Sequence, residues 1–411
     1  MVTDVFRELG SEVAAALGAP NIRTSVIPHP LGELKREEVR EVSRKAFPDI
    51  MRNLLAPKAE LHEDAEESVA QTLPLSGSPE QLNDYFYEHG WTDGLPIVPP
   101  LRENVAKMLA SVAHDPATVI GIIPPRMGIA TLEKIAINAV MAGCLPDYFP
   151  IVVASIKAIC RPEFNLLPMQ ATTNPVTPMI IVNGPIVKRL QINAGYNVLG
   201  QGWRSNATIG RALRLVLTNI GGGIPGKLDK ACHGQPGKFS LCIAENIEAS
   251  PWEAFHVEKG YRADDSTVSV IGVTGTQDII HYARTNARKV LDAIIRAIPR
   301  EGYKNLYSGG EPLLVIAPEQ ASILGKEGLS KRDVKRIIFE GTKIPLTLFD
   351  PETVQLIAGR RSRLFTEAPD RTEIPIADRV EDIQVVVAGA AGNHSVFMPT
   401  WGDTRCVTLK I

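Results

Sequence analysis

The segment Val268–Val273, VSVIGV, is a short apolar run rich in β-branched residues, which is typical of a buried strand. Gly275 interrupts the chain after it, and the pattern over Thr276–Arg296 predicts a helix. Two later runs are also apolar, LLVIA at Leu313–Ala317 and DIQVVVA at Asp382–Ala388. Apolar strands separated by helices predict an α/β protein with mixed, largely parallel sheets flanked by helices.

The same alternation extends to both sides of this segment. Further strands are expected at Val119–Ile123 and Met179–Val182. Helices are expected at Leu101–Ala113, Thr131–Ala142, Phe149–Ile159, Thr208–Thr218, Glu319–Leu324 and Lys331–Glu340. Before them, Ser78 can cap a helix with Pro79 at its first position and Gln81 as the partner of a capping box. We therefore expect the main domain to begin near residue 79.

The chain divides into three segments by composition. Residues 79–411 form the large domain, which divides further into candidate lobes at 79–262 and 263–411. Residues 56–78 are acidic and rich in alanine, as in a linker. Residues 1–55 predict a helix, one strand and a second helix, at Val5–Leu17, Ile22–Ile27 and Lys35–Leu55. One strand cannot make a sheet, so this first block resembles half of a domain.

Composition excludes several classes of protein. The chain has 411 residues, a formal net charge of −2 and 44% hydrophobic residues. A balanced charge gives no general attraction to nucleic acid or to an anionic membrane. The N-terminus carries Asp4, Glu8 and Glu12 where a signal peptide is apolar, and no run reaches the roughly 18 apolar residues of a membrane span. We expect a cytoplasmic protein without a disulfide framework, because its five cysteines are scattered.

Glycine and proline are dense between Asn183 and His256, where they predict ordered binding loops. The turn Gly200-Gln201-Gly202-Trp203-Arg204-Ser205-Asn206 leads into the expected helix at Thr208–Thr218. A glycine-rich turn at a helix N-terminus presents free N–H groups and the positive end of the helix dipole. This turn is therefore a candidate anion or carboxylate site, with Arg204 and Arg211 adding charge. The alternative is a tight turn with a helix cap.

The next loop carries residue types that bind metal ions. Thiolate and imidazole are suitable ligands for zinc or iron. The candidate ligands are Cys232, His233, Cys242 and His256, and Glu245 is a candidate base. Their spacing fits no zinc-finger pattern, so buried cysteines and hydrogen-bonded histidines are the alternative.

Three other stretches offer weaker candidates. Trp91 and Asp93 could line a pocket, but the favoured alternative is that their loop is only a proline-stiffened connection into the core. Thr274, Thr276 and Asp278 follow the strand at Val268–Val273, and strand ends of this kind bind ligands in α/β sheets. Near the C-terminus, His394 is a candidate for acid–base chemistry.

Several long segments resemble proteins of the UGSC family, which use a thiol or selenol. They are GWTDGLPIVPP, ATLEKIAINAVMAGCLPDYFP, INAGYNVLGQGWRSNATIGRALRLVLTNIGGGIPG and HGQPGKFSLCIAEN with SPWEAFHVEKG, all within Ser78–Ile411. The segment IRTSVIPHPLGELKREEV in residues 1–55 resembles the second half of the small domain that carries the family motif. The motif itself, Sec/Cys-Gly-Ser-Cys, does not occur. The two Gly-Ser pairs are followed by Glu12 and by Pro79.

The resemblance implies a thiol- or selenol-dependent oxidoreductase whose large domain binds a small-molecule substrate. It implies that Asn183, Arg204, Asn206, Glu245 and His256 bind or polarise the substrate, with Gly200, Gly202 and Trp203 beside them. Cys232 or Cys242 would act as a resolving thiol. The missing motif has three explanations. The recorded chain starts downstream of a selenocysteine codon, a separate small subunit carries the motif, or the motif has been lost.

Two other functions stay open. One is a metal-dependent hydrolase or lyase that uses Cys232, His233, Cys242 and His256 around zinc or iron, with Glu245 as the base. The other is a non-catalytic protein that binds a small molecule. The expected partners are the substrate, a second copy of the chain in a homo-oligomer, and a small UGSC-motif subunit if the chain is complete. Neither nucleic acid nor a membrane is expected.

Overall fold

The computed structural model describes residues 1–32, 34–56, 72–282, 285–298, 301–366, 368 and 371–411. The N-terminal block contains helices α1 (Arg7–Ala16) and α2 (Arg36–Leu55). Its strand β2 (Val26–Ile27) pairs in parallel with β1 (Val2–Thr3). The expectation of a single strand in this block was therefore wrong. A strand of two residues is too short to show the alternation of apolar and polar residues by which strands are recognised in a sequence. Most of the expected linker, residues 57–71, lies outside the described residues.

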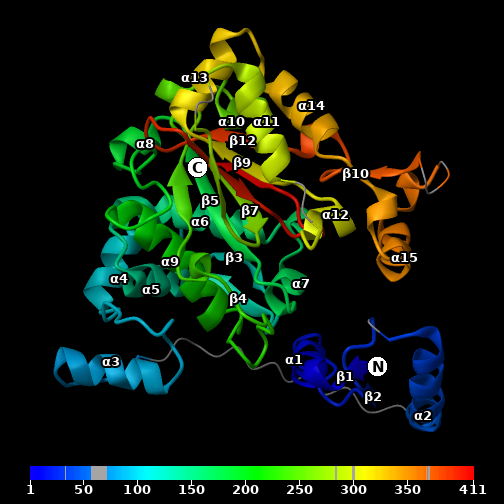
Figure 1. Ribbon diagram of the computed structural model, residues 1–411. Helices are drawn as coiled ribbons and strands as arrows, with labels where there is room; N and C mark the ends of the chain where they lie inside the picture. Colours follow the sequence, from blue (N-terminus) through cyan, green and yellow to red (C-terminus); the bar gives the residue numbers. More distant parts are fainter. Residues whose placement is uncertain (33, 57–71, 283–284, 299–300, 367, 369–370) are drawn as a thin grey trace.

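The large domain is built around two four-stranded sheets (Figure 1). The first sheet has the order β14-β7-β5-β6. Its strands are β5 (Thr177–Asn183), β6 (Cys242–Ala244), β7 (Thr267–Val273) and β14 (Val407–Lys410). β5 and β7 are buried along their whole length, as their largely apolar character predicts. This sheet combines strands from both sides of residue 262, so the expected lobes share it.

The second sheet has the order β12-β9-β13-β8. Its strands are β8 (Gln277–Ile280), β9 (Leu313–Ile316), β12 (Gln384–Val387) and β13 (His394–Met398). The helix expected over Thr276–Arg296 was wrong in its first part, where β8 forms instead. β8 pairs with β13, which lies more than one hundred residues later, so no local pattern indicates it. Two short sheets complete the set, from β3 (Val119–Ile123) with β4 (Gly128–Thr131) and β10 (Ile344–Pro345) with β11 (Glu373–Ile374).

The α/β class with mixed sheets flanked by helices is confirmed. Among the described strands, however, antiparallel pairs outnumber parallel ones. Only β1–β2, β5–β6 and β9–β12 are parallel there. The sheets are therefore less parallel than their apolar runs predict. A strand buried on both faces is apolar whichever way its neighbour runs, so composition does not report direction.

Helices cover these sheets, and several match the expected bounds. The large-domain helices before β7 are α3 (Pro79–Glu88), α4 (Arg102–Leu109), α5 (Leu132–Ala142), α6 (Phe149–Ile159), α7 (Leu166–Ala171), α8 (Ile186–Arg189), α9 (Arg204–Asn219) and α10 (Phe255–Glu258). The later ones are α11 (Ala287–Ala297), α12 (Lys304–Ser308), α13 (Pro318–Lys326), α14 (Lys331–Gly341) and α15 (Pro351–Arg360). The Ser78 capping box and the Thr131 cap are both present. Among the described residues, no helix is long and apolar enough to cross a membrane.

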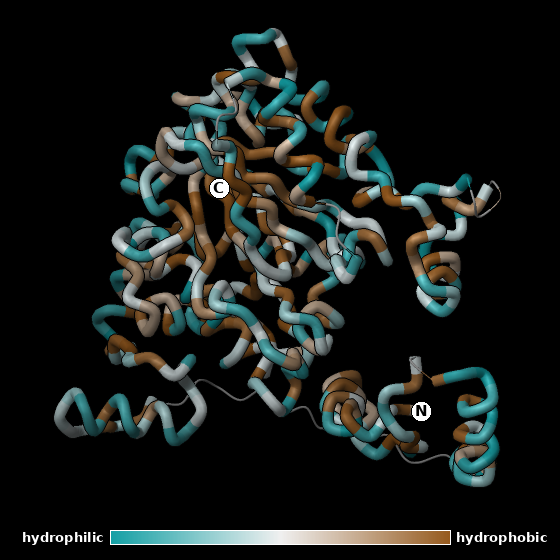
Figure 2. The backbone as a smooth tube through the Cα atoms, viewed as in Figure 1, coloured by the Kyte–Doolittle hydropathy of each residue, from teal (hydrophilic) through white to brown (hydrophobic). Residues whose placement is uncertain are grey.

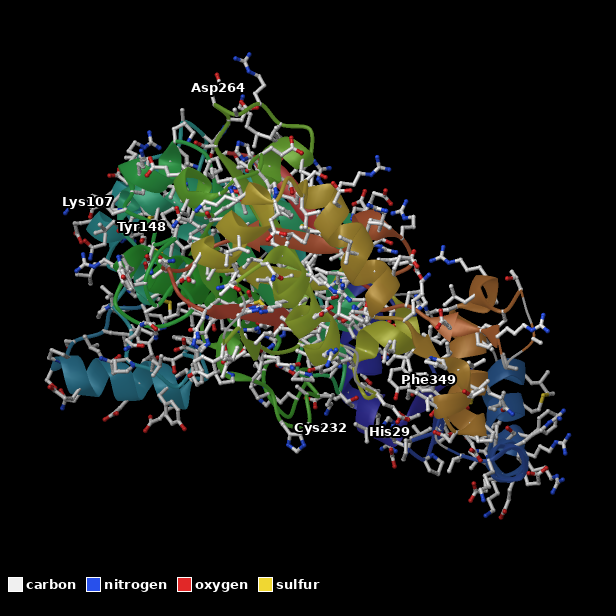
Figure 3. All side chains as sticks on the ribbon, turned by 45° about the horizontal axis from the view of Figure 1, so that its top comes forward. His29, Lys107, Tyr148, Cys232, Asp264 and Phe349 are labelled. Carbon is white, nitrogen blue, oxygen red and sulfur yellow. The ribbon has the colours of Figure 1, made fainter. Side chains whose placement is uncertain are left out.

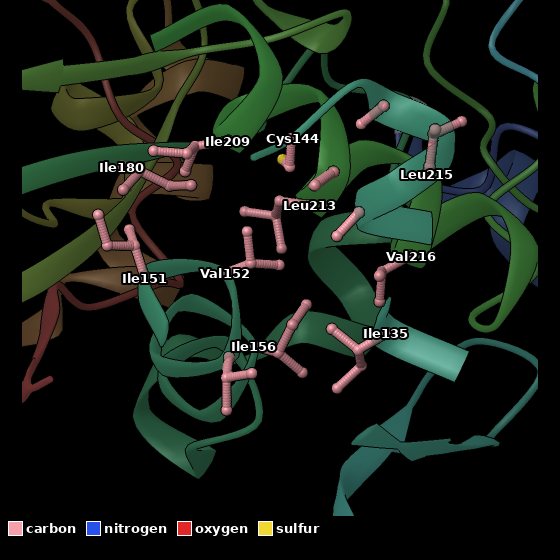
Figure 4. Packing of buried hydrophobic residues seen from close by; sticks show 14 of the residues in the cluster. Ile135, Cys144, Ile151, Val152, Ile156, Ile180, Ile209, Leu213, Leu215 and Val216 are labelled. Atoms are coloured by element: carbon pink, nitrogen blue, oxygen red, sulfur yellow. The ribbon is translucent and has the colours of Figure 1, made fainter. Parts of the chain in front are cut away.

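The apolar residues concentrate in the interior, where the sheets and helices α5, α6 and α9 meet (Figure 2). Figure 4 shows Val152 and Ile156 of α6 packing near Leu213 of α9 and Ile135 of α5. A second cluster packs α11, α13 and α14 on the second sheet. Each cluster stabilises its own sheet, since burial of apolar surface contributes about 25 cal/mol per Å².

A buried ionic group joins α10 to α14. Lys335 donates from Nζ to Glu258 Oε1, and Lys331 Nζ lies 3.4 Å from Glu258 Oε2. Both lysine side chains are at most 5% exposed. Burial alone would raise the pKa of Glu258, but Lys335 and Lys331 outweigh it and hold the pKa below its ordinary value. The carboxylate therefore stays ionised and offsets one of the two positive charges.

We predict that Glu258→Ala lowers the free energy of unfolding by about 3–5 kcal/mol, because it leaves two buried ammonium groups without their carboxylate. Glu340→Ala, which removes the exposed i,i+3 pair with Lys343, should cost less than about 1 kcal/mol. Urea unfolding of both variants measures the difference. Since the pKa of Glu258 is lowered, its contribution is present above pH 4.5 and is lost as the pH falls through the folded value. Equal costs for the two variants would contradict the buried role.

Candidate functional site

Three glycine-rich segments from different parts of the chain meet at one cavity. The cavity has a volume of about 210 Å³. The segments are the loop after α3, the turn after α9 and the loop before β6. The lining residues are Thr92, Asp93, Arg214, Thr218, Gly223, Pro225, Asp229, Lys238 and Phe239. We call this cavity the charged pocket.

One wall of the charged pocket is held by an arginine–carboxylate pair. Arg211 donates from Nε and Nη2 to the two carboxylate oxygens of Asp93, at 2.8 Å each. Arg211 Nη2 also contacts the carbonyl oxygens of Leu95 and Pro96. The Asp93 side chain is only 5% exposed. A bidentate pair of this kind fixes geometry as well as charge, so Asp93 is neutralised and the loop is rigid.

Arg214 lies one helical turn beyond Arg211 on α9. Its Nε donates to the Lys238 carbonyl at 2.8 Å, and its Nη2 donates to Thr177 Oγ1 at 3.1 Å. Within the described part of the chain, its Nη1 makes no hydrogen bond. Burial lowers the pKa of Arg214, while Asp229 and Asp93 act in the opposite direction. A guanidinium remains charged in proteins, so this side chain offers the pocket a fixed cation with donors to spare.

Lys238 forms a second ion pair at the pocket, with Asp229. Its Nζ donates to Asp229 Oδ2 at 2.6 Å. Burial lowers the pKa of Lys238, and the hydrogen bond to Asp229 opposes that shift. Among the lining residues, Arg214 and Lys238 equal Asp93 and Asp229 in number. Arg211 does not line the cavity, but it pairs with Asp93 and so gives the group an excess of one cation. The pocket therefore favours a small anionic ligand.

The turn Gly221–Gly223 brings the backbone close to its neighbours. A Cβ atom on Gly221 would lie 2.8 Å from the Pro124 carbonyl oxygen, and one on Gly222 would meet the Arg126 side chain. Gly222 also has a φ of +73°, which favours glycine. Arg126 in turn lies 3.8 Å from Glu12 of α1. The N-terminal block thus contacts the large domain beside the turn that lines the charged pocket.

The predicted anion turn lies elsewhere. Helix α9 begins at Arg204, so its first turn includes Arg204, Ser205 and Asn206. Gly200, Gly202, Trp203 and Arg204 are exposed, and none of them lines the charged pocket. Asn206 is buried and structural. It accepts from the Asn193 N–H at 2.8 Å and donates to the carbonyl oxygens of Asn193 and Cys242 at 3.0 Å each.

Asn183, Glu245 and His256 lie at the opposite end of β5, within the interior. Asn183 Nδ2 donates to Glu245 Oε2, which also accepts from the Phe255 N–H at 2.7 Å. Burial raises the pKa of Glu245. His256 is fully buried, and burial lowers its pKa. The backbone groups of Ala263 and Arg262 act in the opposite direction but do not cancel the shift. The structure brings these predicted residues together, but it covers them with protein.

The cysteines differ in exposure: Cys144 and Cys242 are buried, and Cys160 and Cys406 are half-buried. Cys232 is exposed, and Figure 3 shows it at the edge of the molecule. Burial raises the pKa of Cys144 and Cys406 to about 12 and that of Cys160 to about 11. It also raises the pKa of Cys242. Figure 4 shows Cys144 among aliphatic side chains. These four thiols are protonated at neutral pH and are poor nucleophiles.

The predicted metal ligands do not form a site. Cys232 and His233 lie in an exposed loop, whereas Cys242 and His256 are buried. Among the described residues, no group of three or more histidine, cysteine or acidic side chains is arranged to hold a metal ion. In the sequence, the four predicted ligands lie in one loop-rich region. In the structure, Cys242 belongs to strand β6 of the first sheet and is separated from the exposed loop of Cys232 and His233.

Sequence reasoning named Asp93 and Arg211 but missed Arg214, Asp229 and Lys238. Arg211 and Arg214 are three residues apart, which places them on one face of a helix, and this signal was available. The loop positions of Asp229 and Lys238 carried no such signal. Of the weaker candidates, His394 Nδ1 lies 3.0 Å from Asp278 Oδ1 on the adjacent strands β13 and β8.

The structure is that of an α/β protein with a cavity lined by two cations and two carboxylates. Comparison with known families adds a relationship for the N-terminal block: residues 1–56 match the sequence model of the UGSC family. This confirms the resemblance of that block, in a chain that lacks the Gly-Ser-Cys motif. No curated protein matches the chain.

We predict that one thiol per native chain reacts rapidly with a disulfide reagent at pH 8, and that all five react in denaturant. The reason is that Cys232 alone among the five is exposed. Cys232→Ser should remove the rapid phase. Its persistence in that variant would show that another cysteine is accessible.

We also predict that Asn206→Ala lowers the free energy of unfolding by about 2 kcal/mol, because buried backbone groups of Asn193 and Cys242 lose their partner. Arg204→Ala, on the neighbouring exposed residue, should change it by less than about 0.5 kcal/mol. Thermal or urea unfolding checks both. If the two variants are equally stable, Asn206 does not hold the loop to β6.

Proposed function

We propose that this chain is the substrate-binding part of a thiol- or selenol-dependent oxidoreductase, and that the charged pocket binds a small anionic substrate. The observation that carries the proposal is the Arg214 side chain. It lines a cavity of about 210 Å³ and keeps a donor nitrogen without a partner among the described residues. A cation held in place by protein contacts binds an anion without first losing conformational freedom.

The protonation and burial of the cysteines support the proposal that this chain binds the substrate and that the UGSC motif supplies the nucleophile. Four of the five thiols are protonated and shielded, so they are unsuited to attack a substrate. Cys232 is the candidate for a resolving thiol, because it is exposed and its loop continues to Lys238 at the charged pocket. The nucleophile of this proposal is the thiol or selenol of the UGSC motif, supplied by a partner subunit or by another form of the chain.

The position of the N-terminal block also supports the proposal. Through Glu12 and Arg126 it contacts the Gly221–Gly223 turn, whose last residue lines the charged pocket. The ion pair is exposed and contributes little energy by itself. Its value is positional, because it holds α1 of the family-matching block next to Arg126, which contacts the Gly221–Gly223 turn.

The test is binding of small carboxylates to the full chain, measured by calorimetry with acetate and succinate and with neutral acetamide as the control. We predict that a carboxylate binds and acetamide does not, and that Arg214→Gln weakens carboxylate binding by about 10- to 100-fold, the value of a charged hydrogen bond. The matched control is Arg204→Gln, an exposed arginine on the same helix, which should leave the Kd unchanged.

Two results would contradict the proposal. The first is equal affinity in the wild type and in Arg214→Gln. The second is equal binding of carboxylate and acetamide. Cys232→Ser separates the two halves of the proposal, because it should leave the Kd unchanged and act only on a thiol-dependent turnover.

A further inference from the structure

A second cavity, of about 300 Å³, lies where the two four-stranded sheets meet. It is lined by Asn174, Pro175, Thr274, Gly275, Thr276, Gln277, Gly302, Tyr303, Lys304 and Pro399. Thr274 and Gly275 follow the carboxyl end of β7, and Pro399 follows β13. In open α/β sheets, ligands bind beyond the carboxyl ends of strands. We call this cavity the junction pocket.

The walls of the junction pocket are fixed by hydrogen bonds. Thr274 donates from its N–H and its hydroxyl to the Pro399 carbonyl, at 2.8 and 3.1 Å. Gln235 Nε2 donates to the carbonyl oxygens of Pro175 and Val273, at 3.0 and 2.9 Å. Tyr303 donates its hydroxyl to Gln277 Oε1. These bonds join both sheets, so the pocket is a built feature of the fold.

Several donors at this pocket have no acceptor. The backbone N–H groups of Gly275 and Thr276 make no hydrogen bond to another described residue, and neither does the Thr276 hydroxyl. The Lys304 ammonium forms no ion pair with any described carboxylate within 4 Å. A Cβ atom on Gly275 would meet no neighbour within 4 Å, so space is open in front of its backbone.

The charge of the pocket has one sign. Lys304 is its single ionisable cation, and no carboxylate is among the lining residues. The carboxylate that acts on the pKa of Lys304 is Asp403, which is already paired with Arg360 at 3.2 Å. Burial and Arg360 both lower the pKa of Lys304, so a bound anion would restore charge balance at this point.

We propose that the junction pocket binds a phosphate group, with the Gly275 and Thr276 N–H groups, the Thr276 hydroxyl and the Lys304 ammonium as its donors. Adjacent backbone N–H groups with a lysine suit a tetrahedral oxyanion, which accepts several hydrogen bonds at once. The volume of about 300 Å³ is at the lower end for small-molecule sites, so a small phosphate ester fits as well as free phosphate. The site is separate from the charged pocket and does not depend on its function.

The test is calorimetric titration of the full chain with inorganic phosphate and, separately, with glycerol phosphate. We expect saturable binding that Lys304→Gln weakens at least tenfold, as expected for the loss of a charged hydrogen bond. Lys304→Arg keeps the charge and should retain most of the affinity. The matched control is Lys289→Gln, an exposed lysine on α11, which should leave the Kd unchanged. Tighter binding of the ester would identify an organic phosphate as the ligand, and equal binding would identify free phosphate.

Unchanged affinity in Lys304→Gln, or no binding of either probe, would overturn the proposal. Arg214→Gln serves as an independent check, because it should weaken carboxylate binding at the charged pocket by about 10- to 100-fold and leave phosphate binding intact. Loss of phosphate binding in Arg214→Gln with full binding in Lys304→Gln would place the phosphate in the charged pocket and also overturn the assignment. Thermal unfolding of each variant confirms that it is folded before titration.

Discussion

The antiparallel pairing of β5 with β7 is the constraint on which the rest of the molecule depends. Its register joins Thr177 to Val273 at one end and Asn183 to Thr267 at the other. Every residue of both strands is buried, so a shift of one residue would exchange the side chains packed on the two faces and break close packing on both, which is strongly disfavoured. Because the register is fixed, the groups at each end of the pair are fixed as well.

The first end of this pair serves both pockets. Thr177 accepts a hydrogen bond from Arg214 of the charged pocket, and the carbonyl of its register partner Val273 accepts one from Gln235. Val273 leads directly into Thr274 and Gly275 of the junction pocket. The loop that contains Cys232, Gln235 and Lys238 therefore runs from one pocket to the other. At the second end, Asn183 and Glu245 are enclosed, which suits a structural role.

The charged side chains of this chain and its thiols differ in how far they are buried. At the charged pocket, Asp93 pairs with Arg211, Asp229 pairs with Lys238, and Arg214 forms no ion pair with a described carboxylate. Most thiols, in contrast, are fully or partly removed from water. A protein that used its own core cysteines would have to stabilise their thiolates, and desolvation does the opposite here. Anion binding by the large domain and sulfur or selenium chemistry from the UGSC motif are therefore complementary parts of one proposal.

The sequence by itself determined the α/β class, most helices of the large domain and the caps at Ser78 and Thr131, because these depend on neighbours within a few residues. It also indicated that the N-terminal block, residues 1–55, resembles the UGSC family. Tertiary structure alone decided the direction of the strands, the pairing of β8 with β13 and the exclusion of His256 and Cys242 from solvent. It also decided that Arg214, Asp229 and Lys238 meet at one cavity. Those features arise from contacts between residues far apart in the chain, and a local pattern carries no information about which distant segments will pack together.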